Sequence, residues 1–285
     1  MTGLCDLHTH SHYSDGTFAP GEILAEAAAQ GLSAVALTDH NTVAGLPEFL
    51  AAGRGSGLLA IPGVEVSAGY SGKEVHIVGL FLPPERFREV AAFVDVILRR
   101  KEESNRRLVQ ALNREGFALE YDTLLRSHAS GNINRAVIAS ALLERGYIAS
   151  REEAFRGILS SHNGVYQPPE RLCAFEVIAF LASIQAVPVL AHPFLNFQEP
   201  ELRQFLTRAK GHGLAAMETV YSTFTQSQTV SARRIAREFG LKESGGSDFH
   251  GAVKPDIQLG TGRGNLAVPA EFANALIPVS PERSV

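Results

Sequence analysis

Apolar and polar positions alternate along the chain with two periodicities, one typical of strands and one typical of helices, and segments of the two kinds follow one another. Strand-like apolar runs lie at 3–8, 32–40, 57–68, 73–82, 186–194, 213–220 and 240–251. Segments with helical spacing lie at 19–31, 199–213 and 229–240. The first of these begins near Pro20 and ends at Gly31, and a turn-forming "GYSG" separates the third and fourth strand-like runs. This order predicts an α/β barrel or a doubly wound sheet.

The alternation of strand-like and helical segments stops between residues 100 and 168, where the sequence is rich in charged residues and has helical spacing. We expect an inserted helical subdomain at 100–168, between a first barrel part at 1–99 and a second at 169–285. From Arg99 to Arg151 there are ten Lys or Arg and six Asp or Glu. This local excess of positive charge fits either a solvated helix surface or a lid that helps to hold an anionic substrate.

Composition narrows the class of protein. The chain has 285 residues, 45% of them hydrophobic, with a formal charge of −4. This weak negative charge gives no argument for non-specific wrapping of nucleic acid or for attraction to a membrane surface. Cys5 and Cys173 are the two cysteines, far apart and without a CxxC pattern, which excludes a disulfide framework. We see no export signal or membrane span and expect a cytoplasmic protein without an obligate protein partner.

Ionisable residues stand at or near the ends of most apolar runs. They are His8, His10, His40, Glu65, His76, His192, Asp248 and His250. His8 and His10 are two apart in "DLHTH", so a strand directs both rings to one point. Individually hydrogen-bonded histidines could explain any one of these residues, but burying the whole set without cations would be costly. The C-terminal rim of a parallel barrel is where such side chains converge.

The types of candidate ligand limit which metal ions fit the site. Imidazoles and carboxylates without a thiolate cluster suit Mn²⁺, Fe²⁺ or Zn²⁺ rather than a structural cysteine-based zinc site. Their number exceeds what one ion needs. The sequence therefore predicts a centre with more than one divalent cation.

Five motifs occur in order between residues 6 and 251: "DLHTH…SDG", "LTDHN", "GVEVS", "LAHP" and "GSDFHG". They resemble those of the PHP family, the polymerase and histidinol phosphatase family of metal-dependent phosphoesterases. The resemblance implies a distorted (β/α)7 barrel, with the helical insertion, around two or three ions. Residues 8–46 together with the insertion are most similar to the branch that includes nucleoside 3′,5′-bisphosphate phosphatases and an exonuclease acting on RNA 5′ ends.

The resemblance also implies a ligand set, with Mn²⁺ as the expected metal. His8, His10 and Asp248 would hold one ion, and Glu65 would bridge it to a second ion held by His76 and His192. A third ion would be held by Asp15, His40 and His250. Asp39 would accept a hydrogen bond that orients an imidazole. Glu65, Asp248 and His250 are also the catalytic candidates.

Substrate contacts are expected from both parts of the chain. Arg135 in "GNINRAVIA" corresponds by resemblance to an Arg of the branch's insertion motif, and its planar fork suits a non-reacting phosphate. Ala136 and Val137 stand where the branch often has Pro-His. A helix cap with Arg135 on a solvated face is the alternative. The further candidates are Asn132 and Asn134 for phosphate or ribose, Ser222 and Tyr221 at a strand end, and Phe194 for base stacking or plain packing.

These residues lead to one expected activity. We expect a phosphoric monoester hydrolase that removes the 3′-phosphate from nucleoside 3′,5′-bisphosphates, giving the nucleoside 5′-monophosphate, with a metal-bridged hydroxide as nucleophile. The alternatives are a 5′-to-3′ exonuclease on short RNA and a histidinol-phosphate-type phosphatase. An amidase or deaminase on a similar barrel and an inactive metal-binding module are more distant alternatives.

Overall fold

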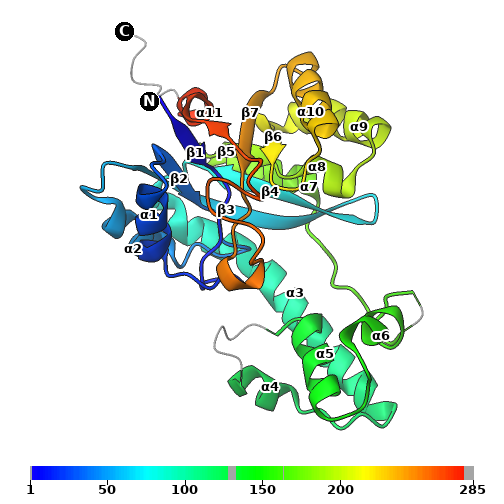
Figure 1. Cartoon of the computed structure of the whole chain (residues 1–285). Coiled ribbons are helices and arrows are strands. Elements are labelled where there is room, and N and C mark those ends of the chain that lie inside the picture. The colour runs from blue at the N-terminus through cyan, green and yellow to red at the C-terminus, as the bar shows by residue number, and fades with distance from the viewer. Residues whose placement is uncertain (1, 128–132, 163, 279–285) are drawn as a thin grey trace. The chain divides into compact units, whose positions relative to one another are not determined.

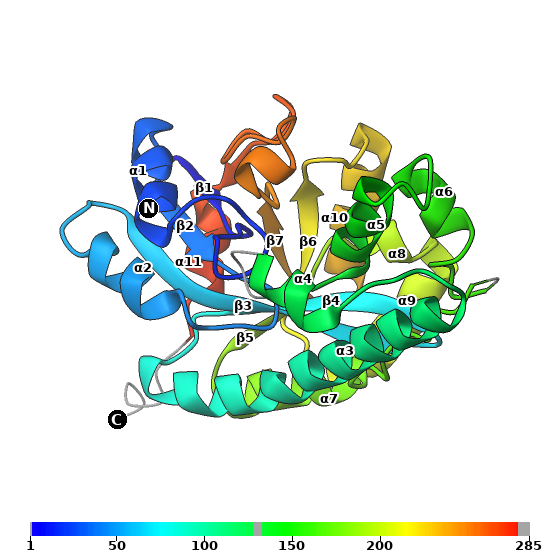
Figure 2. The same cartoon turned by 90° about the horizontal axis from the view of Figure 1, so that it is seen from below.

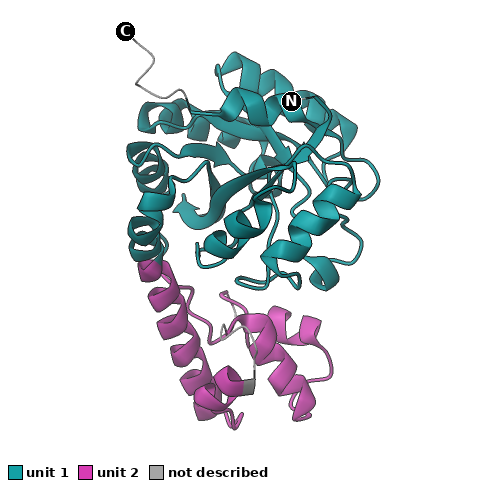
Figure 3. Ribbon diagram, turned by 90° about the vertical axis from the view of Figure 1, so that its left-hand side faces the viewer, with its two compact units in different colours: residues 1–94, 171–285 teal, residues 95–170 magenta. Residues whose placement is uncertain are grey.

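The computed structural model describes residues 2–127, 133–162 and 164–278 and divides the chain into two compact units, coloured separately in Figure 3. Unit 1 comprises residues 1–94 and 171–285, and unit 2 comprises 95–170. The expected insertion at 100–168 is slightly shorter than unit 2. Helix α3 (Phe87–Arg114) is continuous across the first border, so that border falls inside a helix rather than at a loop.

Unit 1 contains one eight-stranded sheet. Its strands are β1 (Leu4–Asp6), β2 (Ala34–Leu37), β3 (Leu59–Tyr70), β4 (Lys73–Leu80), β5 (Val187–Leu190), β6 (Ala216–Tyr221), β7 (Lys242–Gly246) and β8 (Val268–Pro269). The order is β7-β6-β5-β4-β3-β2-β1-β8. Pairing is parallel for β1–β2–β3 and β5–β6–β7 and antiparallel for β3–β4, β4–β5 and β1–β8.

Backbone contacts beyond β1 and β7 nearly close this sheet into a barrel. Leu7 N donates to Gly245 O at 3.1 Å, and Asp248 N donates to His8 O at 2.9 Å. A Cβ atom at Gly246 would lie 2.4 Å from Cβ of His8, so glycine permits this close approach. The distorted barrel expected from the sequence is therefore confirmed, with a two-residue β8 as an additional strand.

Helices flank the strands of unit 1. They are α1 (Pro20–Ala29), α2 (Leu46–Gly53), the start of α3, α7 (Ala174–Ser183), α8 (Pro193–Asn196), α9 (Glu199–Ala209), α10 (Gln226–Glu238) and α11 (Ala270–Leu276), with 3-10 turns η1 (Pro84–Arg86), η2 (Lys210–His212) and η3 (Gly251–Val253). Figures 1 and 2 show α1 and α2 side by side on one flank of the strands. None of the helices in the described part of the chain is long and apolar enough to cross a bilayer.

Local sequence explains where several elements begin and end. Helix α1 has Pro20 at its first position, Glu22 accepts from the backbone N of Ala19 at 2.7 Å, and Gly31 takes a left-handed φ of +69° after the last turn. Ser71 and Gly72 both have positive φ, which matches a two-residue hairpin turn between β3 and β4. The turn expected at "GYSG" is therefore present, and it joins the two strands of a hairpin.

The barrel interior is filled by small and branched apolar side chains. Ala34, Ala36, Ile61, Val78 and Val189 are fully or almost fully buried there. Ala270, Ala273 and Leu276 of α11 join the same core. This packing supports the strands from which the functional side chains project.

Unit 2 has its own hydrophobic core. It contains the rest of α3 with α4 (Tyr121–Ser127), α5 (Arg135–Glu144) and α6 (Arg151–Arg156). Leu108, Leu112, Ile138 and Leu142 are buried in its core. Over its full length, unit 2 has eleven Lys or Arg and ten Asp or Glu, so the positive excess in 99–151 is nearly balanced within the unit.

Candidate metal centre

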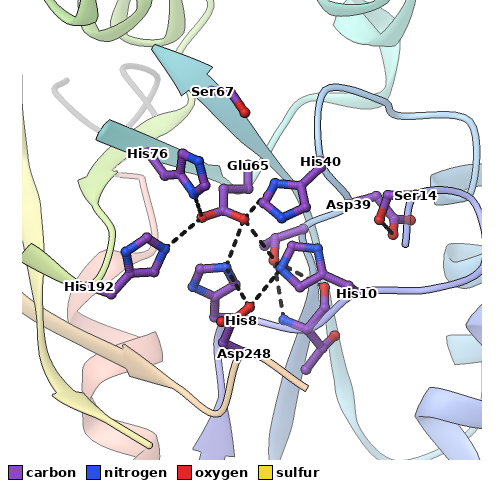
Figure 4. Close-up of polar contacts among 12 residues, drawn as sticks. His8, His10, Ser14, Asp39, His40, Glu65, Ser67, His76, His192 and Asp248 are labelled. Atoms are coloured by element: carbon purple, nitrogen blue, oxygen red, sulfur yellow. Dashed lines mark hydrogen bonds and ion pairs between the residues drawn. The ribbon is translucent and has the colours of Figure 1, made fainter. Parts of the chain in front are cut away.

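Nine imidazole and carboxylate side chains meet at one end of the barrel, and Figure 4 labels Glu65 together with cluster side chains that surround it. They are His8, His10, Asp15, His40, Glu65, His76, His192, Asp248 and His250. Most follow the C-terminal ends of β1, β2, β5 and β7, whereas Glu65 and His76 lie within the antiparallel hairpin of β3 and β4. All nine residues expected from the sequence are therefore brought into one cluster.

Glu65 lies at the centre of the cluster and is fully buried. Its Oε1 is 2.8 Å from Nδ1 of His76 and 3.0 Å from Nε2 of His192. Its Oε2 is 2.9 Å from Nδ1 of His40 and 3.2 Å from Nε2 of His8. One oxygen thus faces the pair expected for the second ion, and the other faces the opposite side, which is the arrangement that a bridging carboxylate requires.

The remaining candidate ligands form two neighbouring groups. Asp248 Oδ1 is 3.1 Å from Nε2 of His10 and 3.8 Å from Nε2 of His8. His250 donates from Nδ1 to the Asp248 carbonyl at 2.8 Å, when that nitrogen carries the proton, and its Nε2 lies 3.3 Å from Asp15 Oδ1. His10 and His40 also lie within reach of this second group. The expected three sets are therefore contiguous and share side chains.

The cluster has the properties of a metal site. Among the residues that the structure describes, buried atoms of the cluster without a hydrogen-bond partner are His8 Nε2, both ring nitrogens of His10, His40 Nδ1, His192 Nδ1 and Glu65 Oε2. An unpaired buried polar group costs about 1–3 kcal/mol. Two donors bound to one cation at about 2.1 Å lie about 3.0–3.4 Å apart. His10 Nε2 lies 3.3 Å from Glu65 Oε2 and 3.1 Å from Asp248 Oδ1, so the donor atoms fit divalent cations.

Electrostatics keeps the carboxylates of the cluster charged. Burial opposes the charge of Glu65, but the surrounding His40, His8 and His76 rings hold its pKa well below the usual value. The pKa of Asp248 is also held well below its usual value, because the histidine contacts outweigh its burial. Burial and the nearby His40 lower the pKa of His10 to about 3. His10 is therefore a neutral imidazole at pH 7, the form that binds a cation.

Two of the cluster residues have strained backbones. His192 has a φ of 27° and Asp248 a φ of 57°, in the left-handed region that non-glycine residues seldom occupy. Such conformations cost about 1–3 kcal/mol and persist where the surrounding structure imposes them, commonly at functional sites.

The comparison with known families agrees with this geometry. The model of the PHP domain matches residues 6–163, more than half of the chain. The chain belongs to the PHP family. Its resemblance to that family, first inferred from the motifs, is confirmed.

Relatives of this PHP protein extend over most of its length. A 5′-3′ exoribonuclease of Haemophilus influenzae is 31% identical over 251 residues, covering 88% of this chain and 91% of the relative. A 3′,5′-nucleoside bisphosphate phosphatase of Chromobacterium violaceum is 28% identical over 247 residues, covering 86% of both chains. The crystal structure of a Bifidobacterium adolescentis protein assigned as a metal-dependent phosphoesterase superposes with a TM-score of 0.77 at 26% identity, covering 96% of this chain and 95% of the other. The expected class, a phosphoester hydrolase, is therefore confirmed.

Strand β6 supplies two buried side chains, Glu218 and Tyr221, that contact residues of this PHP cluster without belonging to it. Glu218 was not predicted from the sequence. Glu218 Oε1 lies 2.7 Å from Nδ1 of His8, and its Oε2 accepts from the backbone N of His192 at 2.6 Å. Tyr221 donates its hydroxyl to Asp248 Oδ2 at 2.7 Å. A carboxylate inside the apolar run 213–220 was the available signal for Glu218.

Lys254 was also missed. It follows η3, and its Nζ lies 2.7 Å from Asp248 Oδ2. Burial and the Asp248 carboxylate raise the pKa of Tyr221, so the phenol stays protonated and donates. Lys254 stands outside every motif, so local sequence had no signal for it.

Asp39 holds a loop rather than a ring. It accepts from the backbone N and the hydroxyl of Ser11, each at 2.7 Å, and from the hydroxyl of Ser14 at 2.7 Å. The expectation that its carboxylate orients an imidazole is replaced by this role. These bonds shape the segment between His10 and Asp15, which explains how Asp15, with a half-exposed side chain, stays near His250.

The residues expected to contact substrate have varied environments. Ser222 donates its hydroxyl to Ser247 O at 2.6 Å, and the half-buried ring of Phe194 lies 5.5 Å from that of Phe224. Within unit 2, Asn134 is the N-cap of α5 and accepts from Val137 N at 3.0 Å. Asn132 lies outside the described residues.

Arg135 also makes contacts inside unit 2. Its guanidinium carbon lies 4.3 Å from the ring centre of Tyr166 and 5.5 Å from that of Phe155. Its Nη1 donates to Leu159 O at 3.3 Å. The N-cap alternative applies to Asn134, and the guanidinium of Arg135 stacks on aromatic rings rather than lying on an open solvated face.

Proposed function

We propose that this protein hydrolyses the phosphoester bond at the 3′ oxygen of a nucleotide that also carries a 5′-phosphate, with nucleoside 3′,5′-bisphosphates as its substrates. The observation that carries the proposal is the placement of Glu65 between two sets of histidines, with orphaned buried nitrogens around it. The similarity to a bisphosphate phosphatase over 86% of both chains supports the substrate class.

The residues present fit two or three divalent cations. His8, His10 and Asp248 would hold one, His76 and His192 a second with Glu65 between them, and Asp15, His40 and His250 a third. Nitrogen and oxygen donors without thiolate suit Mn²⁺, Fe²⁺ or Zn²⁺. Of these we propose Mn²⁺, on the resemblance to the family. Such ions, when bound, lower the pKa of water and neutralise phosphoryl oxygens during in-line displacement.

The chain's own groups set the geometry for that chemistry. Glu218 holds Nδ1 of His8, which leaves Nε2 for the cluster, and the Asp248 carbonyl holds Nδ1 of His250 in the same way. Arg135 is our proposed clamp for the phosphate that does not react, supported by its match to the branch's insertion motif and by its planar donor fork. Asn132, Asn134, Ser222 and Phe194 are proposed contacts of the same substrate.

A 5′-to-3′ exoribonuclease is the second candidate function. The similarity to an exoribonuclease of Haemophilus influenzae over 91% of that relative favours it. Release of a nucleoside 5′-monophosphate from an RNA 5′ end breaks the same bond between phosphorus and the 3′ oxygen. The two activities therefore differ in whether the reacting phosphate carries a further nucleotide.

Thiol chemistry supports a proposal for the compartment. Cys5 is a buried and Cys173 an exposed free cysteine. Free thiols without disulfides support a reducing compartment, and we propose the cytoplasm.

The test compares four substrates with protein loaded with Mn²⁺. They are adenosine 3′,5′-bisphosphate, AMP, histidinol phosphate and a short 5′-phosphorylated RNA, each with a His8→Ala control. Phosphate release that is fastest from the bisphosphate and lost in the control supports the proposal. If mononucleotides are released from the RNA much faster than phosphate is released from the bisphosphate, the protein is an exonuclease. If none of the four substrates reacts, both candidate functions are contradicted.

A further inference from the structure

The two carboxylate oxygens of Asp248 have different surroundings. Oδ1 faces the cluster, 3.1 Å from Nε2 of His10. Oδ2 lies on the other side, where the hydroxyl of Tyr221 and Nζ of Lys254 each lie 2.7 Å away. Neither Tyr221 nor Lys254 belongs to the proposed ligand set, and both contacts are charge-assisted hydrogen bonds, the stronger class.

The two donors come from separate parts of unit 1. Tyr221 is the last residue of β6 and is buried, with its ring centre 5.3 Å from that of His192. Lys254 follows η3, and its side chain is 36% exposed. Among the described residues, Lys254 is the one lysine or arginine whose side-chain nitrogen contacts a carboxylate of the cluster.

The backbone of Asp248 is already held, so side-chain rotation is the freedom that remains. Its φ is 57°, and its N donates to His8 O at 2.9 Å. The terminal torsion of an aspartate is broad and nearly two-fold, so a carboxylate plane without fixed partners rotates easily. Two donors on one oxygen determine the plane and thereby determine where the second oxygen points.

We infer that Tyr221 and Lys254 are positioning residues that hold Oδ2 of Asp248 and direct Oδ1 toward the cation bound by His8 and His10. The inference rests on the proposed function only in its use of a divalent cation at the cluster. Because neither residue is a ligand, each would act through Asp248 rather than on the substrate.

The two residues differ in charge, and this difference sharpens the test. Tyr221→Phe removes one neutral donor and leaves the net charge unchanged, so it tests orientation alone. Lys254→Met removes a donor and also a positive charge that competes with the cation for Asp248. If orientation dominates, Lys254→Met weakens cation binding, and if charge competition dominates, it strengthens cation binding.

The experiment is a calorimetric titration of metal-free protein with Mn²⁺, together with the Mn²⁺ spin-resonance spectrum. The variants are Tyr221→Phe, Lys254→Met, the double variant and Lys254→Arg, with Lys210→Met in η2 as the matched exposed-lysine control. Supporting-group substitutions typically cost 10–100-fold in metal affinity. We expect about tenfold weaker binding of one ion in each single variant, about 100-fold in the double variant, recovery in Lys254→Arg and no change in the control.

Other results overturn the inference. Wild-type affinity and spectrum in both Tyr221→Phe and the double variant would show that Oδ2 needs no fixed donors. Tighter binding in Lys254→Met would show that Lys254 acts as a competing charge. Thermal unfolding of each metal-free variant identifies a misfolded one, in which case Lys254→Met and Lys254→Arg decide, because that side chain is partly exposed. The titration uses no substrate, so its failure is distinguishable from failure of the four-substrate assay.

Discussion

Glu218 and His8 meet behind the cluster, with Oε1 of Glu218 2.7 Å from Nδ1 of His8. The other carboxylate oxygen accepts from the backbone N of His192 at 2.6 Å. The buried Glu218 carboxylate of β6 therefore orients two proposed metal ligands at once. It contacts the ring of His8 at Nδ1 and accepts from the backbone amide of His192.

Replacing Glu218 by Gln should weaken metal binding. A glutamine has one acceptor oxygen, so its NH₂ group would face either His8 Nδ1–H or the His192 amide, and one buried donor would lose its partner. We expect a loss of about 1–3 kcal/mol in the free energy of unfolding and about 10–100-fold lower Mn²⁺ affinity. Denaturant unfolding and calorimetry measure both quantities. The exposed Glu271→Gln in α11 is the control, and equal losses in both variants would contradict the prediction.

Replacing Glu65 by Gln tests the bridging assignment. Its two oxygens face different histidine groups, so an amide cannot offer two anionic oxygens to two ions. We expect fewer Mn²⁺ ions per chain in elemental analysis and a fall in turnover of about 100-fold or more. Wild-type metal content together with wild-type turnover would show that Glu65 does not bridge.

The stability of the metal-free protein should depend on pH through His76. Burial opposes the protonated ring, but the Glu65 and Glu74 carboxylates raise its pKa to about 10, above the ordinary value of 6.5. Because the folded pKa is the higher one, the stabilisation is fully present below pH 6.5 and is lost as pH rises toward 10. Denaturant titrations with a chelator, between pH 6 and 10, should show a declining free energy of unfolding.

The His76→Gln variant isolates that effect. It has no titrating ring, so the difference in unfolding free energy between the wild type and this variant should shrink as pH rises. A difference that stays constant from pH 6 to 10 would refute the assignment of the pH dependence to His76.

Arg135→Ala should separate substrate binding from stability. The guanidinium stacks on Tyr166 and donates to Leu159 O, so the substitution removes packing inside unit 2 and should lower the melting temperature. If Arg135 also clamps the non-reacting phosphate, KM for adenosine 3′,5′-bisphosphate should rise about tenfold or more, while KM for an aryl phosphate changes little. Equal changes in both KM values would remove Arg135 from the substrate site.

Much of the fold was predictable because it depends on short-range patterns. The strand-like runs and the helices at 19–31, 199–213 and 229–240 correspond to observed elements, since apolar spacing and flanking Pro and Gly act locally. The sequence predicted the turn between β3 and β4, but it did not predict that β3–β4 and β4–β5 pair in antiparallel directions. Strand direction in a sheet depends on partners that lie far apart in the sequence, as β4 and β5 do.

The sequence by itself determined which side chains could form the cluster, because His, Asp and Glu at the ends of buried strands have few stable alternatives to shared cations. The tertiary structure decided which of their atoms face one another and what holds them. His8 and His10 meet Asp248 because backbone contacts between Leu7 and Gly245 join β1 to β7. Glu218 reaches His8 only through that closure, since no local pattern specifies a contact between residues 210 positions apart. Tyr221 meets Asp248 because β6 pairs with β7.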